Sequence, residues 1–267
     1  MTDGHPIPQI GFGTYRLNDD LAISSVERAL EVGYRHFDTA ASYHNETEVG
    51  ATLASSGLPR DELFITSKVW TDGLADPRRA LETSLEKLKL DHLDLYLIHW
   101  PSVIKHGRAY VDCWDQLQVL RDEGLTTSIG VSNFHDHHLA ELRGAVPAIN
   151  QVEVHPSFTQ PELSAQLAAR GIPVAAWSPL GRARDLTDQV IQQISVESGR
   201  TPGQVVLRWH LAAGRVVIPR SSNPDRIAEN FQLLDFRLST EQCALIDSLN
   251  DPVNGRTRGL NPDTADW

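Results

Sequence analysis

The sequence has few cysteines, no excess of basic residues and no long apolar run, and each of these absences excludes a class of protein. The two cysteines, Cys113 and Cys243, are far apart and have no CxxC spacing, so neither a disulfide framework nor a cysteine-based zinc site is indicated. We expect both to be small buried side chains in a reducing environment. The net charge of −11 argues against nucleic acid or an anionic membrane surface as the main partner.

No stretch approaches the roughly 20 apolar residues of a membrane-spanning helix, and the first residues lack the basic and apolar regions of a secretory signal. We therefore expect a cytoplasmic monomer without nucleic-acid or membrane partners. Hydrophobic residues make up 40% of the chain and charged residues 22%, as is typical of a globular protein. No Pro- or Ser-rich linker divides the 267 residues, so we expect one domain over residues 1–267.

Short apolar runs alternate with stretches of helical spacing along the whole chain. Gly33 and Pro77 are typical end and start signals of such helices. The repeated alternation favours an α/β fold whose parallel sheet closes into a (β/α)8 TIM barrel. An open doubly wound sheet is less favoured, because Arg16 stands at the third glycine position of its fingerprint after Gly11 and Gly13. The runs that we expect to be strands are residues 10–15, 34–37, 63–69, 93–99, 127–131, 149–154, 173–177 and 215–219.

Four polar side chains stand at or just after the ends of successive expected strands: Asp38, Tyr43, Lys68 and His99. Because the carboxyl ends of barrel strands meet at one rim, we expect these side chains to lie together. The pKa of a tyrosine hydroxyl, about 10, is lowered by a neighbouring ammonium, and a buried carboxylate keeps that ammonium charged. A neutral histidine can hydrogen-bond to a carbonyl group. The set is therefore suited to protonating a carbonyl oxygen while hydride reaches the carbon.

Each of these residues also has an ordinary explanation when it is taken alone. Asp38 could cap a helix, Lys68 could be a solvated charge at a strand end, and His99 could be a hydrogen-bonded core histidine. Their placement on consecutive strand ends favours a joint catalytic role, because one geometric rule then explains all of them.

The chain resembles the aldo-keto reductase superfamily, in particular the bacterial group that includes 2,5-diketo-D-gluconate reductases. The segments that carry the resemblance span nearly the whole chain in the family's order. They are residues 7–14 (IPQIGFGT), 33–40 (GYRHFDTA), 43–46 (YHNE), 65–70 (ITSKVW), 94–101 (DLYLIHWP), 129–134 (IGVSNF), 150–153 (NQVE), 177–181 (WSPLG) and 218–221 (IPRS). The resemblance implies an NADPH-dependent reductase of aldehydes and ketones that needs no metal.

The resemblance also implies a role for each matching residue. Tyr43 would be the proton donor, with Lys68 and Asp38 setting its pKa, and His99 would orient the substrate carbonyl. Trp177 stands where the family has an aromatic side chain that stacks on the nicotinamide ring. The residues that match the carboxamide-binding positions are Ser132, Asn133 and Gln151, and those that match the loop along the pyrophosphate are Ser178, Pro179, Leu180 and Gly181.

The same resemblance places the adenosine end of the cofactor against the last strand and the helix after it. Arg220, Ser221 and Arg226 form a basic group suited to a 2′-phosphate, and Glu229 and Asn230 match adenine-contacting positions. Arg220 departs from the family's usual lysine. Because arginine binds phosphate through two parallel hydrogen bonds, we expect NADPH as the cofactor, with NADH as an alternative.

We expect the substrate pocket to be lined by Tyr15, Trp70, His99 and Trp100. The connection over residues 100–114 and the tail after residue 250 are short compared with those of mammalian relatives. We therefore expect an open pocket that admits small aldehydes, keto sugars and dicarbonyls. The physiological substrate is not fixed by the sequence, since pocket loops decide it.

Two other functions remain open at this point. A metal-dependent barrel hydrolase would use histidines near strand ends, and His135, His137 and His138 follow one. We expect these three to lie on the surface, because no carboxylate at ligand spacing converges on them, and we predict no metal site. The other alternative is a protein that binds the nicotinamide cofactor without catalysis, as a sensor or an accessory subunit. Turnover of an aldehyde separates it from an enzyme.

Overall fold

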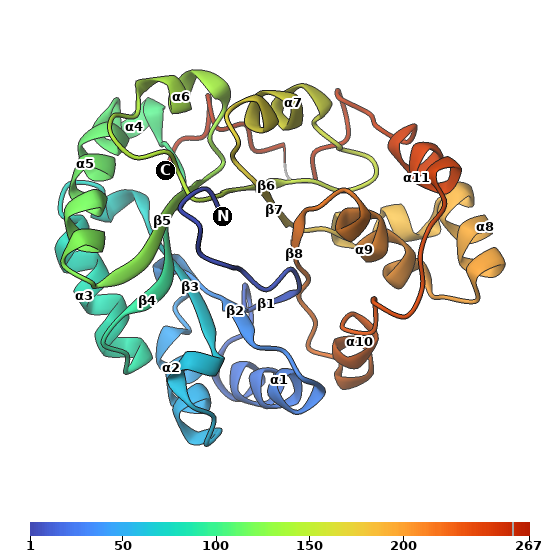
Figure 1. Cartoon of the computed structure of the whole chain (residues 1–267), viewed down its shortest axis with the longest axis horizontal. Helices are drawn as coiled ribbons and strands as arrows, with labels where there is room; N and C mark the ends of the chain where they lie inside the picture. The colour runs from blue at the N-terminus through green and yellow to red at the C-terminus, as the bar shows by residue number, and fades with distance from the viewer. Residues whose placement is uncertain (258) are drawn as a thin grey trace.

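The computed structural model describes residues 1–257 and 259–267, and in them eight parallel strands pair in chain order from β1 to β8. Figure 1 shows these strands as an inner ring with the helices outside it. Ile10 bridges to Val217, and the amide of Gly13 donates to the carbonyl of Pro219 at 3.0 Å, so the ring closes and the predicted barrel is confirmed. The strands are β1 Gly11–Gly13, β2 His36–Asp38, β3 Phe64–Val69, β4 Leu93–Ile98, β5 Thr126–Ser132, β6 Asn150–Glu153, β7 Val174–Trp177 and β8 Val216–Ile218.

Helices follow the strands at the positions that the alternation predicts, with bounds that differ by a few residues. Helix α1 ends at Gly33, whose φ of 116° is left-handed and suits glycine. Helix α9 begins after Thr201, whose hydroxyl accepts from the amide of Gln204 at 3.2 Å. The short helix α4 was not expected. The helices are α1 Asp19–Val32, α2 Glu46–Ser55, α3 Pro77–Leu88, α4 Val103–His106, α5 Ala109–Asp122, α6 Asp136–Glu141, α7 Pro161–Ala169, α8 Gln189–Ser198, α9 Pro202–Ala212, α10 Pro224–Glu229 and α11 Thr240–Asp247.

Apolar side chains fill the layer between strands and helices and also the interior of the barrel. Trp114 and Tyr96 are fully buried in the outer layer, where a large apolar side chain contributes about 1.5–3 kcal/mol. At the amino end of the strands, Met1 and Ile7 pack against the inner cluster, and Figure 1 shows the N-terminal segment in dark blue crossing the barrel opening. The inner cluster consists of Leu95, Leu97, Ala148, Ile149, Ala175, Val216 and Ile218.

The segment after α11 is irregular and returns to the carboxyl end of the strands. The amide of Asp251 donates to the carbonyl of Ser157 at 3.0 Å. A Cβ built on Gly255 would lie 2.0 Å from the same carbonyl oxygen, so this close approach requires glycine. The tail is therefore held against the loop that follows β6.

None of the helices in the described part of the chain combines the length and the apolar content that crossing a bilayer requires. Both cysteines are free; Cys113 is buried as expected, whereas Cys243 is half-buried.

Candidate active site

A buried ion pair joins the ends of β2 and β3. The Nζ of Lys68 lies 2.6 Å from Oδ1 of Asp38 and donates at 2.8 Å to the carbonyl of Thr39. Lys68 is 0% exposed and Asp38 2% exposed. The pair forms because β2 and β3 are neighbours in register, with Asp38 opposite Thr66. These positions exclude a solvated strand-end charge for Lys68.

Tyr43 ends the 3₁₀ turn Ala41–Tyr43 (η1), which follows β2. Its hydroxyl lies 3.4 Å from Nζ of Lys68, and the same nitrogen is 5.0 Å from the centre of the phenol ring. Burial lowers the pKa of Lys68, while the charge and hydrogen bond of Asp38 oppose that shift. An ammonium held against a phenol stabilises the phenolate, which makes the hydroxyl a better acid.

His99 directly follows β4 and faces the same group. Its ring centre lies 5.6 Å from that of Tyr43, and its Nδ1 lies 3.5 Å from the hydroxyl of Ser42. Burial, and then the charge of Lys68, hold the pKa of His99 well below its ordinary value. The imidazole is therefore neutral near pH 7 and can offer an N–H to a carbonyl oxygen. The structure thus brings the four expected residues together; their catalytic roles stay predictions.

The residues expected at the nicotinamide carboxamide lie on or directly after β5 and β6, and they form one hydrogen-bonded group with Trp177 of β7. Asn133, in left-handed conformation with φ 64°, donates to the carbonyl of His99 at 3.0 Å and accepts from Nε1 of Trp177 at 2.9 Å. Ser132 donates to the backbone oxygen of Gln151 at 2.7 Å. The side-chain amide of Gln151 donates at 2.7 Å to Oδ2 of Asp38, a contact that the sequence did not predict. The group therefore connects directly to the ion pair.

The loop expected along the pyrophosphate follows β7 and is tightly built. Ser178 and Gly181 have positive φ values of 48° and 54°, and a Cβ on Gly181 would lie 2.4 Å from the carboxylate of Asp185. The carbonyl of Pro179 lies 3.0 Å from Nε2 of the buried His210. Leu180 packs against the hydrophobic core.

The residues expected at the adenosine end lie after β8 and on α10. Arg220 is exposed as a residue and donates at 2.8 Å to the carbonyl of Arg16. Partial burial of its guanidinium, and then the charge of Arg16, lower the pKa of that group. The sequence did not predict that Arg16 lies at this end of the site. The backbone amide of exposed Arg226 is capped by Asn223. The other three residues expected here are the buried Ser221 and Asn230, and Glu229, which accepts a hydrogen bond from Thr201 at 2.6 Å.

The aromatic residues expected in the substrate pocket surround Tyr43 and His99. The Tyr15 ring lies 5.0 Å from Tyr43, and the Trp70 ring lies 5.1 Å from His99. The tail adds Trp267 to these aromatic side chains, and the open pocket stays a prediction. The ring of Trp267 lies 5.0 Å from that of Trp100 and 6.1 Å from that of Trp70. No periodic signal in the irregular tail could have placed this side chain.

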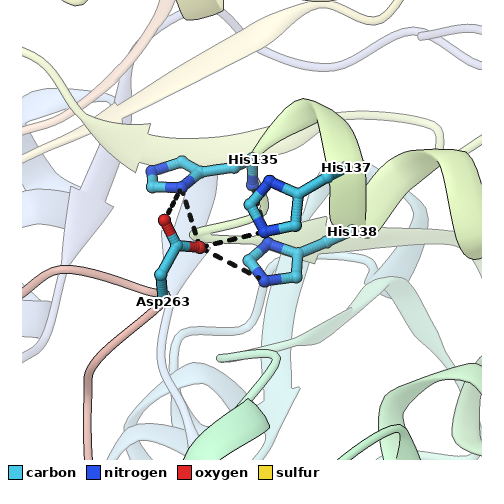
Figure 2. A group of neighbouring side chains, drawn as sticks. All are labelled: His135, His137, His138 and Asp263. Atoms are coloured by element: carbon cyan, nitrogen blue, oxygen red, sulfur yellow. Dashed lines mark hydrogen bonds and ion pairs between the residues drawn. The ribbon is translucent and has the colours of Figure 1, made fainter.

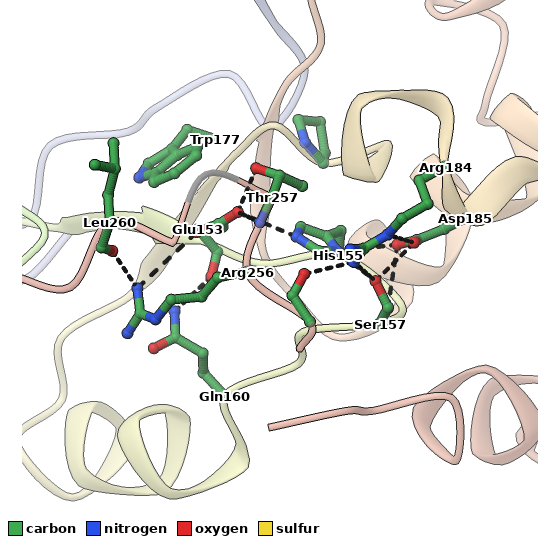
Figure 3. A network of polar contacts seen from close by, with 12 residues as sticks. Glu153, His155, Ser157, Gln160, Trp177, Arg184, Asp185, Arg256, Thr257 and Leu260 are labelled. Atoms are coloured by element: carbon green, nitrogen blue, oxygen red, sulfur yellow. Dashed lines mark hydrogen bonds and ion pairs between the residues drawn. The ribbon is translucent and has the colours of Figure 1, made fainter. Parts of the chain in front are cut away.

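A second buried charged group lies at the end of β6 and in the loop after it (Figure 3), and the sequence did not predict it. His155, 0% exposed, has its Nδ1 2.9 Å from Oδ2 of Asp185 and its Nε2 3.3 Å from Oε1 of Glu153. Thr257 of the tail donates to the same Glu153 oxygen through its amide at 2.8 Å and its hydroxyl at 2.6 Å. Ser157 donates to Asp185 at 2.6 Å. This group ties the tail to the barrel.

The expectation that the three neighbouring histidines lack a converging carboxylate was wrong. Asp263 of the tail lies 3.0 Å from Nδ1 of His135, 3.1 Å from Nε2 of His137 and 3.4 Å from Nε2 of His138. His138 is 1% exposed rather than on the surface. The tail supplies the carboxylate from more than a hundred residues away, which sequence spacing does not reveal.

The chain is similar to known proteins over nearly its whole length. The model described as "Aldo/keto reductase family" matches residues 9–251. Methylglyoxal reductase DkgA of Salmonella typhimurium is 45% identical over 269 residues, which cover 98% of this chain and 96% of that protein. An aldo-keto reductase of Mycolicibacterium smegmatis is 44% identical over 272 residues, which cover 100% and 97%. The crystal structure of a Gox0644 mutant in complex with NADPH has a TM-score of 0.94 at 41% identity, covering 99% of this chain and 97% of that one.

Proposed function

This chain belongs to the aldo/keto reductase family, and from that premise we propose that it reduces aldehyde and ketone groups to alcohols with NADPH, using Tyr43 as the general acid. Small aldehydes, keto sugars and dicarbonyls are the substrate classes. Within them we favour 2-oxoaldehydes, because the DkgA relatives are named methylglyoxal reductases. The substrate is the one small-molecule partner that this activity requires.

The contact of the Lys68 ammonium with both Asp38 and the Tyr43 hydroxyl carries the proposal. The phenol gives its proton to the carbonyl oxygen, and the ammonium stabilises the phenolate that remains. Asp38 keeps the buried ammonium charged, because a lone cation at 0% exposure would lose its proton instead. A general acid in such a position contributes roughly 10²–10⁴ in rate.

His99 has a different role, since its pKa is held low by burial and by Lys68. A neutral imidazole can donate a hydrogen bond to the substrate oxygen and fix its direction toward Tyr43. The edge-on contact with Trp70, at 5.1 Å between ring centres, holds the imidazole in place.

The side chains after β5 to β8 fit a reduced nicotinamide dinucleotide by their chemistry. Amide and hydroxyl groups of Asn133 and Ser132 suit a carboxamide, and the half-exposed indole of Trp177, fixed through its Nε1, offers a flat face. The guanidinium groups of Arg220 and Arg16 suit the phosphate that distinguishes NADPH from NADH. When bound, the cofactor supplies the hydride. This chain supplies binding, orientation and the proton from Tyr43.

Replacing Tyr43 by phenylalanine tests the proposal. We expect Tyr43→Phe to lower kcat for methylglyoxal about 10²–10⁴-fold, because the ring remains and the transferable proton is lost. Loss of NADPH absorbance measures turnover, and quenching of tryptophan fluorescence measures the Kd of NADPH and of NADH, which should be unchanged. Tyr15→Phe removes a neighbouring hydroxyl and should change turnover at most a few-fold. Full turnover in Tyr43→Phe would remove Tyr43 from the mechanism, and a wild type that binds NADPH without turnover would favour a sensor.

We also propose that the protein works as a cytoplasmic monomer. The strongly negative charge of −11 supports a dispersed protein that avoids nucleic acid and anionic membrane surfaces. Size-exclusion chromatography with light scattering measures the mass directly; a dimer would contradict the monomer and leave the proposed chemistry intact.

A further inference from the structure

Apart from the proposed catalytic residues, three imidazole rings and a carboxylate converge from distant parts of the chain (Figure 2). His135, His137 and His138 lie at the start of α6, and Asp263 comes from the tail. Oδ1 of Asp263 is 3.1 Å from Nδ1 of His135, 3.1 Å from Nε2 of His137 and 3.4 Å from Nε2 of His138. One ligand atom from each residue lies within 4.8 Å of all the others.

These separations suit a tetrahedral metal ion. Bonds of about 2.0–2.1 Å from zinc to nitrogen or oxygen place neighbouring ligand atoms roughly 3.3 Å apart. Metal ions bind imidazole through a ring nitrogen that carries no proton.

The hydrogen bonds distinguish His138 from its two neighbours. Its Nδ1 accepts from the backbone amide of His135 at 3.1 Å, so the proton of the neutral ring lies on Nε2. That nitrogen is buried, has no hydrogen-bond partner among the described residues, and lies beside the Asp263 carboxylate. An N–H in this position orients a carboxylate ligand rather than binding the ion itself.

We propose that Nδ1 of His135, Nε2 of His137 and the carboxylate of Asp263 bind one divalent transition metal ion of the zinc type, with His138 as a positioning residue. Two imidazoles and one carboxylate favour zinc, cobalt, nickel or copper over magnesium and calcium, which prefer oxygen ligands. His137 is 64% exposed, so the ion can enter from solvent and water completes the coordination. None of Asp38, Tyr43, Lys68 and His99 takes part, so the site is separate from the proposed reduction.

Because Asp263 belongs to the tail, a bound ion would also hold the tail against the barrel. Asp263 lies four residues before Trp267, which contacts Trp100 and Trp70. An ion shared by Asp263 and the histidines at the start of α6 links the tail to the β5–α6 connection, and so stabilises the folded chain by an amount that rises with the concentration of free metal.

Titration of the full-length protein with ZnCl₂ tests the proposal. After treatment with a chelator, isothermal titration calorimetry should show one zinc ion per chain, and CoCl₂ should give the intense visible absorption of tetrahedral cobalt. His137→Ala and Asp263→Asn should each weaken zinc binding roughly tenfold or more, whereas His138→Gln should weaken it less. Equal loss in His138→Gln and His137→Ala would overturn the assignment of His138 as a positioning residue.

His92→Ala is the matched control, because His92 pairs with Asp91 at 2.7 Å but lies just before β4, at the opposite end of the barrel. We expect this variant to bind zinc as the wild type does, and zinc to raise the Tm of both but not that of Asp263→Asn. Asp263 is 38% exposed, so this variant should fold. Zinc binding that is absent from the wild type, or equal in all variants, overturns the site. Turnover of NADPH is measured separately, so failure of the metal site and failure of the proposed reduction are distinguishable.

Discussion

Two buried cations lie at the carboxyl end of the barrel, Lys68 on β3 and His155 after β6, and their partners differ. Lys68 donates to the carboxylate of Asp38, to a backbone carbonyl and to the half-buried hydroxyl of Tyr43. His155 lies between the carboxylates of Glu153 and Asp185, with one ring nitrogen toward each. Lys68 therefore contacts a hydroxyl that can exchange a proton with a ligand. His155 contacts carboxylates that also accept hydrogen bonds from Ser157 and Thr257 of the protein itself.

Two buried histidines at this end of the barrel show how the neighbouring groups decide the charge of an imidazole. Burial acts to lower the pKa of both His99 and His155, but their neighbours act in opposite directions. At His99 the charge of Lys68 adds to that shift, so the ring is neutral. At His155 the hydrogen bonds to Asp185 and Glu153 outweigh burial and raise the pKa, which favours the charged ring. A neutral ring can adapt its hydrogen bonds to a substrate, whereas a charged ring between two carboxylates fixes the backbone around it.

The largest effect is expected for Lys68→Met, which should cost both stability and activity. It leaves the Asp38 carboxylate buried without its cation, a change that typically costs about 3–5 kcal/mol of unfolding free energy. It also removes the ammonium from the Tyr43 hydroxyl, so turnover should fall at least as far as in Tyr43→Phe. Urea denaturation and NADPH-linked turnover measure the two losses.

The double substitution Lys68→Met with Asp38→Asn is the matched control. Removing both charges should recover much of the stability, because no unpaired charge is left buried. Activity should stay low, because the ammonium is still missing. A double variant that regains turnover would show that the cation acts on folding alone.

His155→Leu should lose stability with little loss of catalysis. Two carboxylates, Glu153 and Asp185, remain buried without their shared cation, and we expect the unfolding free energy to fall by about 3–5 kcal/mol. The kcat of the protein that remains folded should stay within a few-fold, because no contact of His155 reaches the four proposed catalytic residues. Turnover is measured well below the new Tm. A loss of kcat as large as that in Lys68→Met would erase the distinction between the two regions.

The stability of the protein should depend on pH through the ion group of His155, Glu153 and Asp185. The folded pKa of His155 is raised above its ordinary value of about 6.5, so its contribution is complete below that pH and is lost as pH rises through the folded pKa. For Asp185, hydrogen bonds from His155 and Ser157 outweigh burial and lower the pKa, so its contribution is complete above about pH 4 and is lost on acidification. The stability difference between wild type and His155→Leu should therefore be largest between about pH 4 and 6.5. Denaturation series across pH test this, and a flat difference would contradict the charged state of His155.

The sequence predicts the proposed catalytic region well because the barrel converts strand order into proximity. Asp38 and Lys68 end adjacent strands, so one topological rule brings them to 2.6 Å without any knowledge of the loops. The same rule was available for Glu153, which ends β6, and for His155, two residues later. Glu153 even lies in one of the segments that carry the family resemblance, but the partners Asp185 and Thr257 lie outside the strands, where the rule places no residue.

The tail could not be predicted in the same way. Thr257, Asp263 and Trp267 lie in irregular chain, where neither period 2 nor period 3.6 relates sequence spacing to direction. Their contacts depend on single close approaches, such as that of Gly255 to the carbonyl of Ser157. Residues that a regular element positions were predictable, whereas residues that reach the site through the tail required coordinates.

The smallest effect is expected for Trp267→Ala, which tests whether the tail that the His155 group anchors contributes to the pocket beside His99. An aromatic pair contributes about 0.5–1.5 kcal/mol beyond its buried area. A substrate ring that packs on Trp267 loses such a pair in this variant, so the KM for an aromatic aldehyde should rise roughly 2- to 10-fold, with kcat nearly unchanged. Val253→Ala, at an 83% exposed position of the same tail, is the control and should leave KM as it is. An equal KM in both variants would place Trp267 outside the pocket and confine the function of the tail to stability.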